Sequence, residues 1–278
     1  MRRLAPYFVA LIALGSCMSA ADRFDAAASA AGLHRSSVEG AGFRHAIFAN
    51  DVPGDGTLRI YLEGDGKPYV GRAIATDPTT RHSLALALLA KDHRSALYLG
   101  RPCYHGETGT APCTPALWTT ARYGEAVVTS MAAAAMRLIA ERRARAVTWV
   151  GHSGGGTLAM LLAPRILQTC AVVSIGGNID VAAWAGQARE DLSDSLDPAT
   201  APLLPAHIRQ YHYVGGRDEV VPPAITAAAL ARTAETLTVF EEFDHVCCWA
   251  TIWSSILARL DADAGGGPPP LQSAASRD

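Results

Sequence analysis

The sequence predicts an α/β protein with a mostly parallel central sheet and helices on both faces. Segments rich in β-forming residues alternate along the chain with segments of helical pattern, which is typical of parallel sheets. One strand–helix junction, within residues 147–160, contains Gly151-His152-Ser153-Gly154-Gly155. Other candidate functional residues also follow predicted strands directly. Because the carboxyl ends of parallel strands meet at one edge of a sheet, we expect an active site at that edge.

The order of elements follows from runs of β-branched, aromatic and aliphatic residues separated by Gly- and Pro-rich turns. Strands are expected at 43–50 (with a possible hairpin partner at 37–40), 58–62, 95–99, 147–150, 170–175, 209–214 and 237–241. Helices are expected at 81–90, at 123–145, directly after Ser153, at 224–233 and at 246–260. The Ala-rich residues 22–33 fit a surface helix or a loose tether.

Length and composition indicate one globular domain. The 278 residues are 49% hydrophobic and 18% charged, which suits a sizeable core. We expect the domain to span residues 35–261, with a small lid at 182–205, a segment that contains several acidic residues and prolines. Residues 262–278 include Gly-Gly-Gly-Pro-Pro-Pro and are expected to be a disordered tail. The net charge of −2 and the absence of basic stripes argue against a nucleic-acid partner.

The N-terminus has the features of an export signal. Arg2 and Arg3 precede an apolar run, 4–14, that is too short to span a bilayer but fits a signal-peptide core. The run ends in Leu-Gly-Ser-Cys17, which resembles a bacterial lipobox. That resemblance implies a signal peptide at 1–16, a lipid-bearing Cys17 and, because Met18 rather than Asp follows, an outer-membrane lipoprotein. The alternative is an ordinary secretory signal cut nearby; both alternatives export the protein.

Export permits disulfides. Cys103 and Cys113 flank a short loop, so a disulfide between them is the first choice. Cys170 is expected at the opposite end of the sheet from Cys247 and Cys248, and we expect it to be a buried free thiol. Spacing alone leaves the connectivity open.

The stretch around Ser153 is typical of a nucleophile elbow. Strand-forming residues run into Gly-x-Ser-x-Gly and a helical pattern follows at once, which is the order that such an elbow requires. Gly151 and Gly155 stand where side chains would collide with the returning backbone. The first turn of the following helix directs free N–H groups toward the serine. Ser153 is therefore the candidate nucleophile.

A serine hydroxyl needs a base to accept its proton. His245 follows the last predicted strand and precedes the last helix, and it is the candidate base. His105, in the long loop after the 95–99 strand, is the main rival. His152 is expected to face away from Ser153 on the elbow turn.

The base in turn needs an orienting carboxylate. Asp218 lies in a Gly-Gly…Pro-Pro turn after the 209–214 strand and is the candidate acid; Asp180 is the alternative. Asp244 adjoins His245 and is expected to shape its turn. The chain order serine, Asp218, His245 is that of elbow-type hydrolases.

Acyl transfer also requires donors for an oxyanion. The main-chain N–H of Gly154 is one candidate. The second is expected from Glu63-Gly64-Asp65-Gly66 after the 58–62 strand, with the N–H of Asp65 favoured over that of Gly66. Because an ionised Asp65 carboxylate would oppose an oxyanion, its side chain is expected to point outward.

At these motifs the sequence resembles the α/β-hydrolase superfamily over roughly residues 35–260. It looks most like exported bacterial hydrolases. The resemblance implies a central sheet of about eight strands and Ser-His-Asp chemistry. Many relatives carry His-Gly where this chain has Glu63-Gly64, so this chain departs from the family pattern in the loop that is expected to supply the second oxyanion donor.

These observations predict an exported, lipid-anchored serine hydrolase that cleaves a small-molecule ester or related acyl bond through an acyl-enzyme. A serine peptidase on the same fold and a non-catalytic envelope binding lipoprotein are the alternatives. No cofactor or metal is implied, because the sequence contains neither a His-Glu-x-x-His run nor a phosphate-binding loop. The sequence leaves the oligomeric state open.

Overall fold

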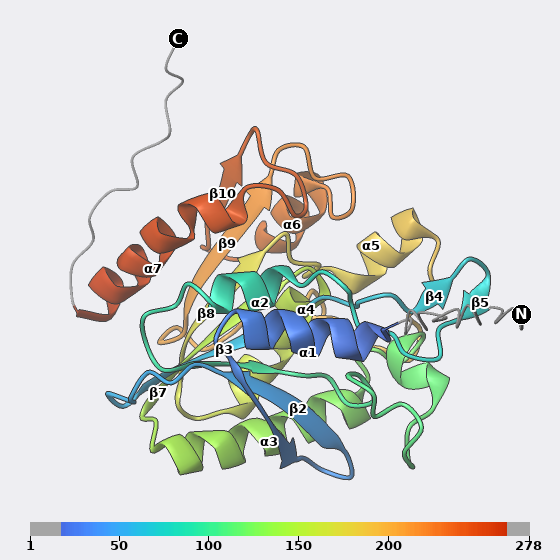
Figure 1. Cartoon of the computed structure of the whole chain (residues 1–278). Helices are drawn as coiled ribbons and strands as arrows, with labels where there is room; N and C mark the ends of the chain where they lie inside the picture. The colour runs from blue at the N-terminus through green and yellow to red at the C-terminus, as the bar shows by residue number, and fades with distance from the viewer. Residues whose placement is uncertain (1–17, 266–278) are drawn as a thin grey trace, which may run out of the picture.

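An eight-stranded sheet forms the centre of the structure, a computed structural model that describes residues 18–265 (Figure 1). The strand order is β1-β2-β6-β3-β7-β8-β9-β10. β1 pairs antiparallel with β2, and β2 with β6, whereas every pair from β6 through to β10 is parallel. The prediction of a mostly parallel sheet of about eight strands is confirmed.

The strands lie close to their predicted positions. They are β1 (His34–Glu39), β2 (Arg44–Ala49), β3 (Thr57–Leu62), β6 (Ala96–Leu99), β7 (Ala146–His152), β8 (Thr169–Ile175), β9 (Arg209–Gly215) and β10 (Leu237–Phe240). A separate small hairpin consists of β4 (Tyr69–Val70) and β5 (Ala73–Ile74). Sequence analysis did not predict this hairpin.

Helices cover both faces of the sheet (Figure 1). The first face packs against α3 (Glu125–Arg142), α4 (Gly154–Leu162), α5 (Val181–Ala188) and α6 (Pro223–Leu230). The second face packs against α1 (Ala20–Ala30), α2 (Leu84–Leu89) and α7 (Trp249–Gly265). Side chains alternate between the two cores, with Trp149 of β7 in the first and Val150 in the second. Burial on both faces explains why central strands such as β6 and β8 are almost continuously apolar.

Several helix boundaries differ from prediction, and three of the differences have a local cause. α2 starts late because the Ser83 side chain caps it by accepting the Leu86 N–H at 2.9 Å. α3 ends early because Arg143 turns to a positive φ of 52°. α7 starts late because the carboxylate of Asp244 holds the N–H of Val246 in a turn.

Both ends of the predicted domain need correction. α1 belongs to the packed domain rather than to a tether, because Phe24 is 1% exposed in the second core. At the other end, the predicted disordered tail begins too early. Residues 262–265 continue α7, and Asp263 accepts a hydrogen bond from the Tyr211 hydroxyl at 2.7 Å. The predicted signal peptide, Cys17 and the remainder of the tail lie outside the described residues.

The predicted lid segment, residues 182–205, contains most of α5 followed by irregular chain. Trp184 of α5 is 9% exposed and donates its indole N–H to the Val220 carbonyl at 2.7 Å. Asp197 accepts the N–H groups of Val181 and Ala182, both at 3.0 Å, and so returns the chain to the start of the helix. The segment therefore packs beside the turn that follows β9.

The cysteines form two bonded pairs. Cys103 and Cys113 are joined with an S–S distance of 2.04 Å and close part of the long loop after β6. Cys247 and Cys248 are bonded to each other, a pairing that sequence analysis did not consider. Cys170 is free and partly buried near the start of β8.

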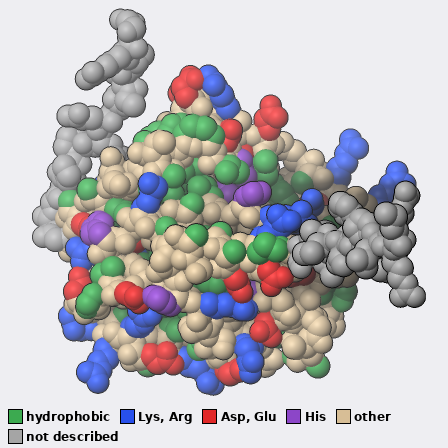
Figure 2. Space-filling view, in the orientation of Figure 1, with side chains coloured by type: hydrophobic (Ala, Val, Ile, Leu, Met, Phe, Trp, Pro, Cys, Tyr) green, Lys and Arg blue, Asp and Glu red, His purple; other side chains and the backbone are tan. Residues whose placement is uncertain are grey.

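Two further features concern the surface and the membrane. On the face drawn in Figure 2, acidic and basic side chains are interspersed. Among residues 18–265, no helix combines the length and the apolar character needed to cross a bilayer.

Candidate active site

Ser153 lies on the turn that joins β7 to α4, with φ 54° and ψ −126°. Residues other than glycine adopt this positive φ at an energetic cost. The Ser153 N–H donates to the Ile175 carbonyl at 3.0 Å, and its carbonyl accepts from the Gly156 N–H at 2.8 Å. A β-carbon at Gly151 would overlap the carbonyl group of Gly155, as the sequence pattern indicated. The turn has the geometry of a nucleophile elbow.

Asp218 and His245 form a hydrogen-bonded pair at the same edge of the sheet. His245 Nδ1 lies 2.8 Å from Asp218 Oδ2. The other carboxylate oxygen accepts the N–H groups of Val220 at 2.9 Å and Val221 at 2.8 Å. The Asp218 side chain has no exposed surface. Because a carboxylate only accepts hydrogen bonds, Nδ1 carries the proton of the neutral ring and Nε2 is left as the proton acceptor.

Residues adjoining Ser153 contact this pair. Gly176 follows Ile175, the acceptor of the Ser153 N–H, and a β-carbon on Gly176 would lie 3.2 Å from His245 Nδ1. His152 precedes Ser153, and its ring centroid is 4.8 Å from that of His245. The hydrogen bonds within residues 18–265 include none between the Ser153 hydroxyl and the His245 ring. Such bonds are often long without substrate.

The close approach of Gly176 to the acid–base pair leads to a prediction. We expect Gly176→Ala to lower kcat by about 10- to 100-fold, because displacements of about 1 Å in a catalytic group have effects of that size. Its φ is 52°, and a methyl group there would lie 3.0 Å from Asp218 Oδ2. Gly186→Ala in α5 is the control, since a β-carbon there meets nothing within 4 Å. Equal steady-state kinetics for the two variants would contradict this geometry.

The predicted oxyanion donors lie on neighbouring segments beside Ser153. Gly64 follows β3, and a β-carbon on it would lie 3.4 Å from Ser153 Oγ. A β-carbon on Gly154 would overlap a carboxylate oxygen of Asp65. The main-chain N–H groups of Gly154 and Asp65 therefore belong to segments in direct contact. Gly66, the alternative donor, is the next residue of the same loop.

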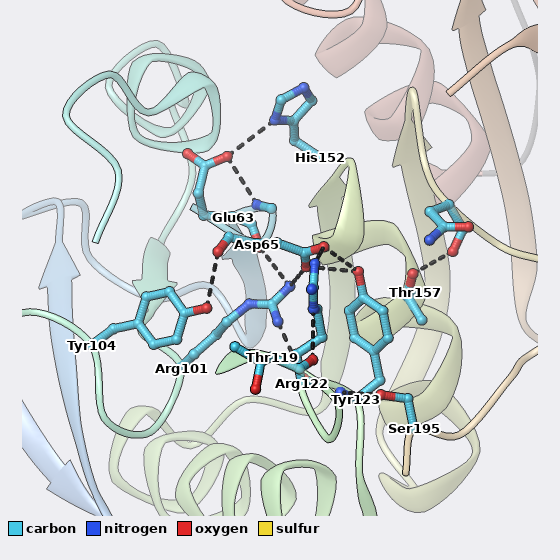
Figure 3. A network of polar contacts seen from close by, with 12 residues as sticks. Glu63, Asp65, Arg101, Tyr104, Thr119, Arg122, Tyr123, His152, Thr157 and Ser195 are labelled. Carbon is cyan, nitrogen blue, oxygen red and sulfur yellow. Dashed lines mark hydrogen bonds and ion pairs between the residues drawn. The ribbon is translucent and has the colours of Figure 1, made fainter. Parts of the chain in front are cut away.

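The predicted outward orientation of the Asp65 side chain is wrong. The side chain is 14% exposed and lies between Arg101 at 2.8 Å and Arg122 at 2.9 Å (Figure 3). The Tyr123 hydroxyl donates to it at 2.6 Å. Burial opposes the charge of Asp65, but the two guanidinium groups outweigh burial and lower its pKa. The carboxylate is thus neutralised close to the predicted oxyanion position.

Several segments contribute to this buried cluster (Figure 3). Arg101 and Tyr104 come from the loop closed by the Cys103 disulfide, and the Tyr104 hydroxyl donates to the Asp65 carbonyl at 2.9 Å. Arg122 precedes α3 and also pairs with Glu190, which follows α5. Contacts to both the main chain and the side chain of Asp65 therefore hold residues 63–66, the loop expected to supply an oxyanion donor, against the rest of the domain.

A second buried pair, Glu63 and His152, also escaped sequence analysis. His152 Nδ1 lies 3.0 Å from Glu63 Oε1, and His152 Nε2 lies 3.0 Å from the main-chain oxygen of His245. The available signal was an acidic and a basic residue, each at the end of a predicted strand. Sequence analysis gave only the expectation that His152 faces away from the serine.

The rival site residues have other environments. His105 packs against Phe24 with ring centroids 4.5 Å apart, and burial lowers the pKa of His105 to about 3. Asp180 caps α5 by accepting the Ala183 N–H at 2.9 Å. Asp244 accepts main-chain N–H groups of its own turn. Within residues 18–265, no cluster of three or more His, Cys, Asp or Glu side chains is arranged to hold a metal.

Comparison with known proteins identifies the fold. No protein-family model matches the chain, and no curated protein matches it in sequence. A serine hydrolase without a lid from Xanthomonas campestris has a TM-score of 0.52 and 14% identity over 86% of this chain and 97% of its own. An esterase of Pyrococcus furiosus has a TM-score of 0.58 and 12% identity, with 84% and 90% of the two chains covered.

A peptidase was also found among the solved structures. The puromycin-hydrolysing peptidase of Mycobacterium tuberculosis is similar over 85% of this chain but 40% of its own, with a TM-score of 0.56 and 16% identity. At these identities the likeness defines the fold and no finer property. The chain has the α/β-hydrolase fold, as its motifs predicted.

Proposed function

We propose that this protein is a serine hydrolase that cleaves an ester or related acyl bond with Ser153 as nucleophile. The observation that carries the proposal is the hydrogen-bonded pair of Asp218 and His245 beside a serine on an elbow turn. A neutral imidazole with a free Nε2, oriented by a buried carboxylate, is the base that a serine hydroxyl requires.

The chemistry follows from these groups. Ser153 Oγ attacks the acyl carbon while His245 Nε2 accepts the hydroxyl proton, and the main-chain N–H groups of Gly154 and Asp65 bind the resulting oxyanion. The bond to the leaving group breaks as His245 returns the proton to the leaving oxygen. Water then attacks the acyl-enzyme while His245 Nε2 accepts its proton. The bond between the acyl carbon and Ser153 Oγ breaks as His245 returns that proton to Oγ, which releases the acid and restores the serine hydroxyl. Asp218 holds the ring throughout.

The role of Asp218 yields a prediction. Asp218→Asn keeps the shape of the side chain but allows its amide to donate to Nδ1, which favours the opposite tautomer. We expect kcat to fall by about 10⁴-fold, the size of the effect in serine proteases. Asp244→Asn is the control, because that exposed side chain binds main-chain N–H groups of its own turn. Comparable kcat values for the two variants would rule out Asp218 as the orienting acid.

A substrate panel tests the bond specificity. We expect p-nitrophenyl acyl esters to be hydrolysed faster than aminoacyl anilides, with both rates lost in Ser153→Ala. Faster cleavage of the anilides would favour a peptidase, the alternative that one similar fold suggests. Absence of any Ser153-dependent turnover would instead favour a non-catalytic binding lipoprotein.

We further propose that the protein is exported and attached to the outer membrane through a lipid on Cys17. The support is the apolar run and lipobox-like sequence that end at this residue. Metabolic labelling with an alkyne fatty acid in a bacterial host tests the proposal. Labelling is expected in the wild type and not in Cys17→Ala, and an unlabelled wild type would favour plain secretion.

A further inference from the structure

Glu63 and His152 lie side by side beneath the loop that holds His245. Glu63 directly follows β3 and His152 ends β7, and these strands are paired in parallel up to Leu62 and Gly151. Both side chains are 7% exposed. Parallel pairing therefore brings the two residues together in the domain interior, where a lone charge would be costly.

The hydrogen bonds of His152 fix its protonation. Nε2 lies 3.0 Å from the carbonyl oxygen of His245, and a carbonyl oxygen only accepts, so Nε2 carries a proton. Nδ1 lies 3.0 Å from Glu63 Oε1. If Glu63 is ionised, Nδ1 must also donate, and the ring is then an imidazolium with both nitrogens protonated.

Other donors around Glu63 favour its ionised form. Oε1 accepts the Gly64 N–H at 3.0 Å, and Oε2 accepts the Ala85 N–H at 3.3 Å. The Ser83 hydroxyl also binds Oε2, while its own oxygen accepts the Leu86 N–H at 2.9 Å, which leaves its proton for Glu63. A carboxylate with this many donors is stabilised as an anion.

The charges around the pair act in the same direction. Burial opposes ionisation of His152, but the hydrogen bond and charge of Glu63, the His245 carbonyl and the nearby Asp218 carboxylate raise its pKa above the usual 6.5. Burial likewise opposes ionisation of Glu63, but His152, Ser83 and the Gly64 N–H lower its pKa below the usual 4.5. The ring of His245 also packs against that of His152, with ring centroids 4.8 Å apart, and the buried Tyr98 and His105 lie close enough to Glu63 to feel its charge.

We propose that Glu63 and His152 are positioning residues: a buried ion pair whose imidazolium holds the main chain of His245 and so sets the place of its ring. The kinetic part of this inference rests on the proposed hydrolase function, whereas the ion pair itself does not. The residue that the pair holds is the one whose side chain binds Asp218. Deprotonation of His152 opposite an ionised Glu63 leaves the ring with one proton for two acceptors, so one of its two hydrogen bonds is then unmade.

The pH range of the pair follows from the directions of the two shifts. Stabilisation by Glu63 is present above pH 4.5 and is lost as the pH falls through its lowered folded-state pKa. Stabilisation by His152 is present below pH 6.5 and is lost as the pH rises through its raised folded-state pKa. Between pH 4.5 and 6.5 both groups are charged, so kcat is expected to fall on the alkaline side as His152 deprotonates.

Nitrogen-15 NMR of histidine-labelled protein tests the ion pair without reference to activity. The His152 signals are assigned by their absence from the spectrum of His152→Gln. At pH 6.5 an ordinary histidine is half protonated, whereas we expect the His152 signals to be predominantly those of an imidazolium. In Glu63→Gln those signals should change to those of a neutral ring. A neutral His152 in the wild type would overturn the proposal, whether or not the protein proves to be a hydrolase.

Kinetics test the positioning role. We expect Glu63→Gln and His152→Gln to lower kcat by about 10- to 100-fold with little change in KM, as for misplacement of a catalytic group. The alkaline limb of the wild-type kcat profile should disappear in both. His45→Gln is the matched control, because His45 of β2 is also fully buried and also makes two hydrogen bonds, but to Gly100 and Ser130 rather than to His245.

Two outcomes would contradict the positioning role. One is a kcat for both Gln variants equal to that of His45→Gln, together with an unchanged pH profile. The other is a loss of kcat that accompanies unfolding alone and is equally large in His45→Gln. If the wild type turns over none of the substrates but is labelled on Ser153 by a fluorophosphonate, the labelling rate replaces kcat in the same comparison. If it shows neither turnover nor labelling, the proposed function fails and the NMR experiment alone decides the ion pair.

Discussion

Ser153→Gly is expected to abolish hydrolysis and at the same time to stabilise the protein. The wild-type serine is held at φ 54° and ψ −126°, a conformation that costs about 1–3 kcal/mol for a residue with a β-carbon and little for glycine. Loss of the nucleophile should lower kcat by about 10⁴- to 10⁶-fold. Thermal unfolding and ester hydrolysis measured on the same preparation check both effects.

Ser153→Ala separates the two effects. Alanine also removes the hydroxyl but retains the β-carbon, so this variant should be equally inactive without the gain in stability. A melting temperature of Ser153→Gly at or below that of Ser153→Ala would contradict the strain inferred at the elbow. Substantial activity in either variant would contradict the role of Ser153.

Asp65→Ala is expected to have the largest effect on stability. The change removes the carboxylate that binds Arg101 and Arg122, whose side chains are 3% and 1% exposed. Removal of one partner from a buried ion pair typically costs about 3–5 kcal/mol, because the other charge remains buried. The free energy of unfolding from urea denaturation checks the expectation. Activity should also fall, because the side chain anchors the loop that supplies the second oxyanion donor.

Glu39→Ala is the control for that experiment. Glu39 pairs with Arg44 at 2.9 Å, but both side chains are more than half exposed. Exposed ion pairs contribute little to stability because water screens them, so this variant should unfold almost like the wild type. A destabilisation of Asp65→Ala no larger than that of Glu39→Ala would show that the cluster around Asp65 is not the anchor of the loop.

Sequence alone predicted the architecture because local signals and the fold agree. Apart from Arg59 and Ser174, residues 58–62 and 170–175 are apolar in the manner of strands covered on both faces. Gly151 and Gly155 stand where the backbone around Ser153 leaves no room for a β-carbon, and the short Gly-x-Ser-x-Gly motif indicates this crowding in the sequence. Asp218 and His245 lie in the turns that follow β9 and β10, so the parallel pairing of these two strands brings them to one edge of the sheet.

The buried polar contacts could not be predicted in the same way. Asp65 was expected to point outward because its charge was considered alone, whereas Arg101 and Arg122 reach it from a loop and a turn far along the chain. Glu63 and His152 meet only because β3 and β7 are neighbours, a topological fact that no local pattern records. In each case the partner that decides the orientation is distant in sequence.

Reaction with a fluorophosphonate, followed by peptide mapping, tests most directly whether Ser153, Asp218 and His245 act as one unit. The serine oxygen displaces fluoride only if its proton is taken up, so labelling reports the activated nucleophile. We expect one adduct, on Ser153, and labelling slowed by about 10³-fold or more in His245→Ala. An adduct elsewhere, or Ser153 labelled at an undiminished rate without His245, would contradict the account.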